Sequence, residues 1–356
     1  MKILLLRLRL IGDVMFTTPV IRAIKRAYPG AHVAYVVEPA AEPLVVNNPS
    51  IDEVIVAHRR RGIRRVLDDI RLARRLRRTG FDLAIDMHGG PRSAWLTWAS
   101  GARERVGYDI PGRRWMYTRV AERSRELRPR HSVINQWDLL RAIPGWSDET
   151  PSPDENPVEM TLDTQADATV AGRLREAGVQ DDAHVIVVHV SAGNPFRRWP
   201  EGHFVDLVVH LAEAGAARRI VLSSGPSDRE AAVRIASAAR HRLGEAADRI
   251  VDLGEFDLQE LRALIGRSRL FVGGDTGPLH IAAATSTPVV GIYGPTLSAR
   301  SAPWRPAGPV TMAVEMEGLA CRPCDQRVCA PGDFRCLTKL MPAAVIQAAE
   351  RALAPV

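Results

Sequence analysis

Short apolar segments alternate with stretches of helical periodicity in two series along this chain, and this alternation restricts the folds open to it. The first series predicts strands at 3–8, 33–37, 53–56 and 82–86, with helices at 14–28, 62–78 and 93–99. The second predicts strands at 185–189, 220–223, 250–251, 270–272 and 289–292, with helices at 202–214, 227–241, 258–265 and 279–285. Such alternation is typical of parallel sheets with helices on both faces. We therefore predict an α/β fold with two Rossmann-like domains.

A linker is expected between the two series. Residues from about 147 to 157 are rich in Pro, Asp and Glu and show no periodicity. A chain of 356 residues is also long enough for two domains. We expect one domain at 1–160 and another at 161–356, facing a cleft, with a final helix at about 342–353 that could pack back on the first domain. Ligands of such sheets bind at the carboxyl ends of the strands.

Composition is that of a soluble globular protein, with 46% hydrophobic and 25% charged residues. No membrane span is expected, because prolines and glycines break the longest uncharged stretch, 281–299. The apolar start could be mistaken for a signal peptide, but Arg7 and Arg9 interrupt it and no small-residue cleavage site follows. We expect it to be the first buried strand of a cytoplasmic protein.

The net positive charge belongs to the first half of the chain. Residues 1–160 hold 27 Lys and Arg against 19 Asp and Glu, whereas residues 161–356 hold 21 against 22. Ten of these arginines lie within 59–78. The helix expected at 62–78 should bury one apolar face, which consists of Ile63, Val66, Leu67, Ile70, Ala73 and Leu76. Its arginine face is either simply solvated or a contact for an anionic surface such as a membrane.

A glycine-rich turn follows the strand expected at 270–272. It reads GGDTGPLH over residues 273–280 and leads into an Ala-rich helix. Glycine lets the backbone approach a ligand closely, and Thr276 can cap the helix or bond a ligand oxygen. A strand that enters a helix through such a turn is a candidate phosphate site. The alternative is an ordinary strand–helix connection, with His280 as a core residue.

Two further strand ends carry candidate chemistry. Asp13 follows the first strand, where it either caps a helix or acts as a general base. The G-x-G-x-x-G fingerprint of dinucleotide enzymes is missing there. After 185–189, a Gly/Pro loop carries Arg197 and Arg198, whose guanidinium groups either bind phosphate or are solvated. The sequence contains neither a D-x-D metal-binding pair near a strand end nor a Walker sequence.

All four cysteines lie close together in the sequence. Cys321, Cys324, Cys329 and Cys336 fall within 16 residues. The spacing C-x2-C is a common half-site for metals, but the following C-x4-C-x6-C is not a standard zinc spacing. A structural metal, a packed loop of reduced thiols and a disulfide all remain open. A disulfide is the least favoured of the three in a cytoplasmic protein.

Four segments together resemble glycosyltransferase family 9, the ADP-heptose:lipopolysaccharide heptosyltransferases. They are KILLLRLRLIGDVMFTTPVIRAIKRAYPGAHV, then DLAIDMHGG with RSAWL and GARERVGYD, then VVHVSAGNPFRRWPEGHF, and finally FVGGDTGPLHIAAATSTPVVGIYGPT. The cysteine segment CRPCDQRVCAPGDFRC also resembles one found in many members. The resemblance covers nearly the whole chain, with the motifs in the expected order.

The resemblance implies a GT-B fold, with the acceptor bound by 1–160 and the nucleotide sugar by 161–356. Asp13 matches the base proposed for the family. The residues that match its donor-binding positions are Ser191, Arg197 (where the family usually has Lys), Asp275, Thr276, Gly277 and His280. The pairing of Arg197 rather than Arg198 with that position depends on loop length. An acidic residue for the donor sugar or ribose is expected at either Asp228 or Glu230.

We therefore expect inverting, metal-independent transfer of heptose from ADP-L-glycero-D-manno-heptose to the inner core of lipopolysaccharide, with no cofactor required. The expected partners are the nucleotide sugar, an anionic glycolipid acceptor and the inner face of the cytoplasmic membrane. One alternative is another nucleotide sugar or another envelope-glycan acceptor. A second is a non-catalytic nucleotide- or nucleic-acid-binding protein. Only 5% aromatic residues provide few stacking platforms, so nucleic acid is not expected as a partner.

Overall fold

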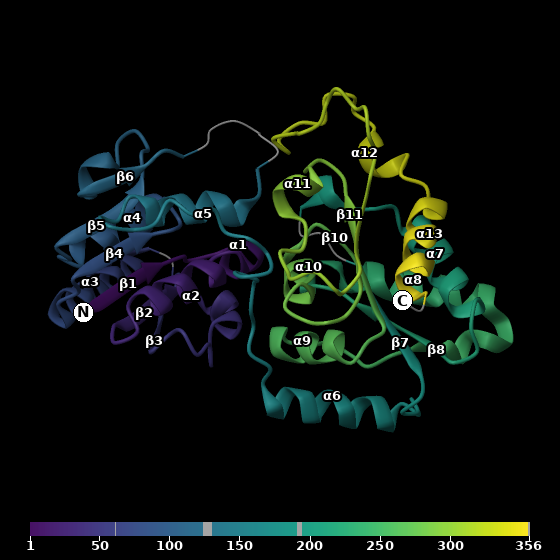
Figure 1. Cartoon of the computed structure of the whole chain (residues 1–356). Coiled ribbons are helices and arrows are strands. Elements are labelled where there is room, and N and C mark those ends of the chain that lie inside the picture. The colour runs from purple at the N-terminus through teal and green to yellow at the C-terminus, as the bar shows by residue number, and fades with distance from the viewer. Residues whose placement is uncertain (61, 124–129, 191–193, 355–356) are drawn as a thin grey trace. The chain divides into compact units, whose positions relative to one another are not determined.

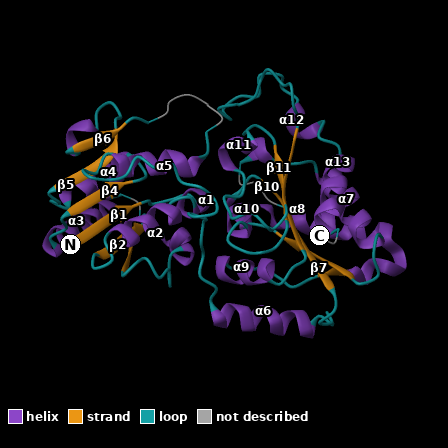
Figure 2. Cartoon of the chain, viewed as in Figure 1, coloured by secondary structure: helices purple, strands orange, loops and turns teal. Residues whose placement is uncertain are grey.

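The computed structural model describes residues 1–60, 62–123, 130–190 and 194–354 of the chain. These residues form two sheets of six strands each, and all the strand pairs are parallel (Figures 1 and 2). The contacts divide the chain into two compact units. Unit 1 comprises Met1–Thr161 with Trp304–Pro306, and unit 2 comprises Leu162–Pro303 with Ala307–Val356. The prediction of an α/β fold with two parallel sheets is confirmed.

Unit 1 alternates strands and helices, and two of its strands, at 104–108 and 119–121, were not predicted. Its strands are β1 (Lys2–Leu6), β2 (His32–Val37), β3 (Glu53–Val56), β4 (Leu83–Asp86), β5 (Glu104–Tyr108) and β6 (Arg119–Ala121). Its helices are α1 (Ile11–Met15), α2 (Thr18–Ala27), α3 (Ile63–Thr79), α4 (Pro91–Ala99) and α5 (Ser132–Arg141), with short 3-10 turns η1 (Pro39–Leu44) and η2 (Arg114–Met116).

Unit 2 repeats the pattern. Its strands are β7 (His184–His189), β8 (Arg218–Ser223), β9 (Ile250–Val251), β10 (Leu270–Gly274), β11 (Val289–Tyr293) and β12 (Thr311–Glu315). Its α-helices are α6 (Thr164–Glu176), α7 (Glu201–Glu213), α8 (Arg229–Leu243), α9 (Leu258–Gly266), α10 (Gly277–Ala282), α11 (Ser298–Ser301), α12 (Arg335–Thr338) and α13 (Pro342–Leu353). The 3-10 turns are η3 (Pro195–Arg197), η4 (Pro226–Asp228) and η5 (Gly244–Arg249).

Both sheets have the strand order of a Rossmann fold. The order is β3-β2-β1-β4-β5-β6 in unit 1 and β12-β11-β10-β7-β8-β9 in unit 2, which is the same arrangement read from the other edge. The direction of winding therefore reverses between β1 and β4, and again between β7 and β10. Ligands of open parallel sheets bind at this reversal, outside the carboxyl ends of the two strands. The loops after β1, β4, β7 and β10 are thus the places to search for function.

The core of each unit lies on both faces of its sheet. The side chains of 3–6 in β1 are fully buried, as are those of 186–188 in β7 and 270–272 in β10. Continuous apolar runs of this kind are what a strand covered on both faces requires. Trp304 is the main contribution of Trp304–Pro306 to unit 1. Its Nε1 donates to the carbonyl of Asn156 at 2.7 Å, and its ring lies 4.6 Å from that of His131.

The single helix predicted at 14–28 is wrong, because the structure has two helices, α1 and α2, that meet at Phe16 and Thr17. Thr17 Oγ1 donates to the carbonyl of Val14 at 2.7 Å, and Thr18 Oγ1 donates to that of Met15 at 2.8 Å. Pro19 then lies in the first turn of α2, where its missing N–H costs nothing. Side-chain bonds to nearby carbonyls compete with helix continuation, and they place the break here.

The apolar face predicted for 62–78 is only partly buried. Ala73 and Leu76 are buried, but Ile63 is 76% exposed, Val66 54% and Leu67 46%. The α3 helix therefore packs on its sheet through its second half. The apolar periodicity of a sequence predicts which face of a helix is apolar, but it does not predict how much of that face packs against other elements.

The final helix predicted at about 342–353 is present as α13. The α13 helix packs against α7 and against β10, β11 and β12 of unit 2. Val345, Ala348, Ala349 and Ala352 are buried in the core of that unit. Their small side chains allow close packing on the strands. Among the described residues, no helix combines the length and the apolar character needed to cross a bilayer.

Candidate functional site

Asp13 lies at the carboxyl end of β1 in unit 1. It belongs to the first turn of α1, and its side chain is 36% exposed. The Arg7 guanidinium forms an ion pair with the Asp13 carboxylate and also donates from Nη1 to the carbonyl of Met87, which follows β4. Arg7 therefore connects the loops on the two sides of the strand-order reversal. The result is an oriented, solvent-accessible carboxylate at the predicted position.

His88 lies in the loop after β4 and is a feature that the sequence reasoning missed. Burial, followed by the positive charges of Arg7 and Arg9, lowers the pKa of His88 to about 4. The imidazole is therefore neutral at pH 7. The available signal was its position directly after a strand end, in the segment DMHGG.

The buried carboxylate of Asp86 fixes the turn that carries His88. It accepts hydrogen bonds from the backbone N–H groups of His88 and Gly89, both at 2.9 Å, and from the hydroxyls of Ser93 at 3.0 Å and Tyr117 at 2.6 Å. Burial raises the pKa of Asp86 despite these bonds. Asp86 is thus occupied by structural contacts.

Asp275 occupies the turn between β10 and α10 in unit 2. It is only 3% exposed. Arg197 Nη1 donates to its backbone carbonyl at 2.7 Å and lies 3.2 Å from its carboxylate, and Thr296 Oγ1 donates to that carboxylate at 2.5 Å. Nε2 of the buried His280 lies 3.6 Å from the other carboxylate oxygen. Asp275 therefore holds Arg197 and Thr296 in place beside the turn.

Thr276 and Gly277 begin α10 beside Asp275. The backbone of Thr276 is extended and its side chain makes no capping bond. Its hydroxyl lies 3.3 Å from the carbonyl of Gly274. The α10 helix has only six residues, so its dipole contributes less than that of a long helix. Positive charge beside this turn comes from Arg197, which contacts Asp275.

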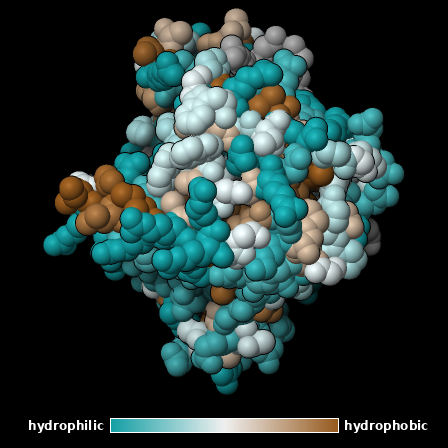
Figure 3. All heavy atoms as spheres, turned by 90° about the vertical axis from the view of Figure 1, so that its left-hand side faces the viewer, coloured by the Kyte–Doolittle hydropathy of each residue, from teal (hydrophilic) through white to brown (hydrophobic). Residues whose placement is uncertain are grey.

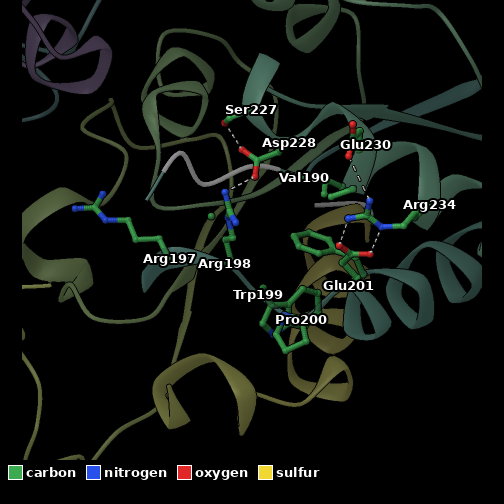
Figure 4. Close-up of a pocket in the computed structure, with 13 residues that line it drawn as sticks. Val190, Arg197, Arg198, Trp199, Pro200, Glu201, Ser227, Asp228, Glu230 and Arg234 are labelled. Carbon is green, nitrogen blue, oxygen red and sulfur yellow. Dashed lines mark hydrogen bonds and ion pairs between the residues drawn. The ribbon is translucent and has the colours of Figure 1, made fainter. Parts of the chain in front are cut away.

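Arg197 and Arg198 point in different directions. Figure 4 shows Arg198 directed at Asp228, 3.2 Å away, whereas Arg197 extends away from Asp228. Arg197 instead contacts Asp275, and its Nε donates to Gln326 Oε1 at 2.8 Å. Its side chain is 29% exposed. Arg197 is therefore the arginine that adjoins the β10–α10 turn. Ser191 lies outside the described residues.

A pocket of about 330 Å³ lies beside this turn. It is lined by the loops after β7 and β8, by the starts of α7 and α8 and by Gly274 at the end of β10. The lining includes Arg197, Arg198, Trp199, Asp228 and Glu230 (Figure 4). Asp228 is 6% exposed and accepts from Ser227 Oγ at 2.7 Å. The side chain of Glu230 is 96% exposed and lies 3.9 Å from Arg234. Of the two acidic candidates, Asp228 is the one held in a defined position.

The four cysteines are joined by no disulfide and lie in a segment with little regular structure. Burial raises the pKa of Cys336. Two of the sulfurs accept backbone hydrogen bonds: Cys324 Sγ from Gln326 N at 3.3 Å, and Cys329 Sγ from Phe334 N at 3.4 Å. Within the described part of the chain, no three His, Cys, Asp or Glu side chains are arranged to hold a metal ion.

Comparison with known proteins supplies the family. Residues 70–333 match the model of glycosyltransferase family 9 (heptosyltransferase). Lipopolysaccharide heptosyltransferase 3 of Escherichia coli is 26% identical over 304 residues, which is 83% of this chain and 84% of that protein.

Two solved structures share the fold. A family 9 glycosyltransferase from Veillonella parvula superposes with a TM-score of 0.84 at 22% identity, covering 99% of this chain and 97% of that one. The E. coli heptosyltransferase WaaC with ADP-2-deoxy-2-fluoro heptose gives a TM-score of 0.68 at 22% identity, with 99% of each chain covered. The paired parallel sheets are thus those of GT-B heptosyltransferase structures. The chain belongs to glycosyltransferase family 9, the heptosyltransferase family, and is a glycosyltransferase.

Proposed function

We propose that the protein transfers heptose from ADP-L-glycero-D-manno-heptose to the inner core of lipopolysaccharide, with inversion at the anomeric carbon and without a metal ion. The names of the relatives support the heptosyl group and the lipopolysaccharide acceptor. The WaaC structure with an ADP-heptose analogue supports the donor. The observation that carries the mechanism is the Asp13 carboxylate, oriented by Arg7 at the end of β1. Family membership argues against the non-catalytic alternative.

The proposed reaction is a single displacement. Asp13 accepts the proton of an acceptor hydroxyl while that oxygen forms a bond to the anomeric carbon of heptose. The bond between the anomeric carbon and the diphosphate oxygen breaks, and ADP leaves with the electron pair. Attack from the face opposite ADP inverts the configuration. The Asp13 side chain is available for this proton because it is 36% exposed and Arg7 orients it at the end of β1.

The leaving diphosphate gains negative charge as the bond breaks. Arg197 is the proposed source of compensating positive charge, assisted by the Thr276 hydroxyl and the N–H groups that begin α10. Asp228 is the proposed contact for the donor sugar or ribose, because it is a fixed carboxylate at the wall of the adjacent pocket. In this scheme no cofactor is required.

A transfer assay tests the proposal. With ADP-heptose and an inner-core lipopolysaccharide acceptor, we expect ADP release at an unchanged rate when EDTA is present. We also expect nuclear magnetic resonance to show a product whose anomeric configuration is opposite to that of the donor. A retained configuration, or loss of activity on chelation, would contradict the mechanism. A strong preference for another nucleotide sugar or another envelope glycan would replace the proposed substrates.

The α3 helix is the proposed membrane contact on the inner face of the cytoplasmic membrane. The exposed side chains of Ile63, Val66 and Leu67 lie on the same helix as exposed arginines, including Arg71 and Arg75. Figure 3, in which the left-hand side of Figure 1 faces the viewer, shows a mostly hydrophilic surface with a protruding group of hydrophobic side chains. Apolar side chains beside arginines are typical of helices that lie on anionic bilayers. Each Arg near such a surface contributes about 1 kcal/mol.

Charge reversal on α3 should abolish this contact. With Arg71, Arg74, Arg75 and Arg78 changed to Glu, we expect no co-sedimentation with anionic liposomes at low salt, where wild type sediments. The fold should survive, since these side chains are exposed and surface ion pairs contribute little.

The matched control reverses the same number of exposed arginines in unit 2, namely Arg175, Arg229, Arg242 and Arg327. This control has the same net charge as the α3 variant and should still sediment. If the α3 variant sediments like wild type, its arginines are only a solvated face.

A further inference from the structure

The cysteine segment is docked on the loop that follows β11, next to the proposed donor site. The backbone N–H of Cys324 donates to the carbonyl of Pro295 at 3.1 Å. The Arg322 side chain, only 5% exposed, donates to the carbonyl of Thr296 at 2.6 Å and pairs with Glu315 at 2.5 Å. Thr296 is the residue whose hydroxyl contacts Asp275. The segment is therefore anchored to the same group of residues that holds the β10–α10 turn.

Gln326 projects from this anchored segment onto the loop after β7. Its backbone is left-handed, with φ of 60°, and its N–H donates to Cys324 Sγ at 3.3 Å. Its side-chain oxygen accepts from Arg197 Nε at 2.8 Å and from Asn194 Nδ2 at 2.7 Å. The Gln326 side-chain oxygen thus connects the cysteine segment to Arg197 and to Asn194, which lies in the same loop as Arg197.

The Arg197 guanidinium is therefore held at two nitrogens by two distant parts of the chain. Gln326 accepts from Nε, and Asp275 accepts from Nη1. Within the described part of the chain, neither contact uses Nη2. A long side chain held in this way has already lost much of its rotational freedom. A ligand that binds it then meets a smaller entropic cost.

We infer that Gln326 is a positioning residue for Arg197, and that the cysteine segment is the element that places it. Gln326 acts on the diphosphate only through the arginine. This inference rests on the proposed function, in which Arg197 binds the donor diphosphate. It gives the cysteine segment a role that requires neither a metal nor a disulfide.

The test is a double-mutant cycle read by calorimetry with ADP. The Gln326→Met change removes the accepting oxygen but keeps a side chain of similar length that is unbranched at Cβ, so Met should meet about the same backbone strain at φ of 60° as Gln does. We expect Gln326→Met to weaken ADP binding about three- to tenfold. In the Arg197→Ala background, the same change should have no further effect. The donor KM should rise by a similar factor, with kcat at saturating donor changing less.

Two further variants test whether a general disturbance of the segment, or the Met side chain itself, could cause the effect. Val328→Ala alters a 75% exposed side chain of the same segment and should leave ADP affinity unchanged. Gln326→Ala removes the oxygen with a smaller side chain and should reproduce the effect of Gln326→Met. Thermal unfolding midpoints should be similar for all of these variants.

The possible results separate the inference from the proposed function. If Arg197→Ala weakens ADP binding but Gln326→Met does not, the inference is wrong and the proposed function stands. If Gln326→Met weakens binding equally with and without Arg197, Gln326 does not act through the arginine, and the inference again fails. If neither variant weakens binding, Arg197 is not part of the donor site, the assignment of Arg197 in the proposed function is contradicted, and the inference that rests on it fails as well.

Discussion

Replacing Arg197 with Ala is expected to weaken ADP binding by about 1.5–3 kcal/mol, the range typical of a hydrogen bond to a charged group. This corresponds to roughly a tenfold to hundredfold higher dissociation constant. The effect should be large because the guanidinium is fixed by Asp275 and Gln326 beside the β10–α10 turn. Calorimetry with ADP measures it directly. Arg197→Lys, which keeps the charge but cannot satisfy both acceptors in the same geometry, should lie between wild type and Arg197→Ala.

The control for this prediction is Arg242→Ala. Arg242 is also an arginine of unit 2 in an ion pair, with Asp206 at 2.5 Å, and it lies on α8 away from the lining of the pocket. Its loss should leave ADP affinity unchanged. Unfolding should be followed in parallel, because Arg197→Ala also removes a partner of the buried Asp275. Unchanged ADP affinity in Arg197→Ala would remove this residue from the donor site and make Arg198 the next candidate.

The sequence predicts the parallel sheets of this protein but not their strands β5, β6 and β12, nor the details of the helices. Runs such as 3–6 and 270–272 are apolar throughout because both faces of a parallel strand are covered. The break between α1 and α2 depends on two threonine side chains that bond to nearby carbonyls, and no apolar period reports such bonds. The exposure of Ile63 and the packing of α13 depend on which neighbours are present, and local pattern does not specify these.

The candidate site shows a similar division. The glycine turn at 273–277 and Asp13 were found because strand ends and helix starts have local signals. Arg7 and Gln326 were missed because their roles come from contacts with other segments. Gln326 and Arg197 are 129 positions apart, and Arg7 and Met87 are 80 apart. The choice between Asp228 and Glu230 also needed burial, which distinguishes two acidic residues only two positions apart.

If Asp13 is the general base, the turnover of Asp13→Asn at saturating donor and acceptor must show it. Asn has nearly the same shape and can still accept a hydrogen bond from Arg7, but it cannot take a proton from the acceptor hydroxyl. We expect kcat to fall by at least about 10²-fold, in line with the usual contribution of a general base. Donor affinity should stay within a few-fold of wild type, since the donor is assigned to unit 2.

Asp52→Asn is the matched control for that measurement. The Asp52 side chain is 37% exposed, close to the 36% of Asp13, and it pairs with Lys25 at 2.7 Å. It precedes β3 and so lies at the amino ends of the parallel strands, whereas Asp13 follows β1 at their carboxyl ends. Its replacement should leave kcat near the wild-type value. Of the two variants, only Asp13→Asn should lose turnover, and near-normal turnover in that variant would contradict the role of Asp13 as the general base.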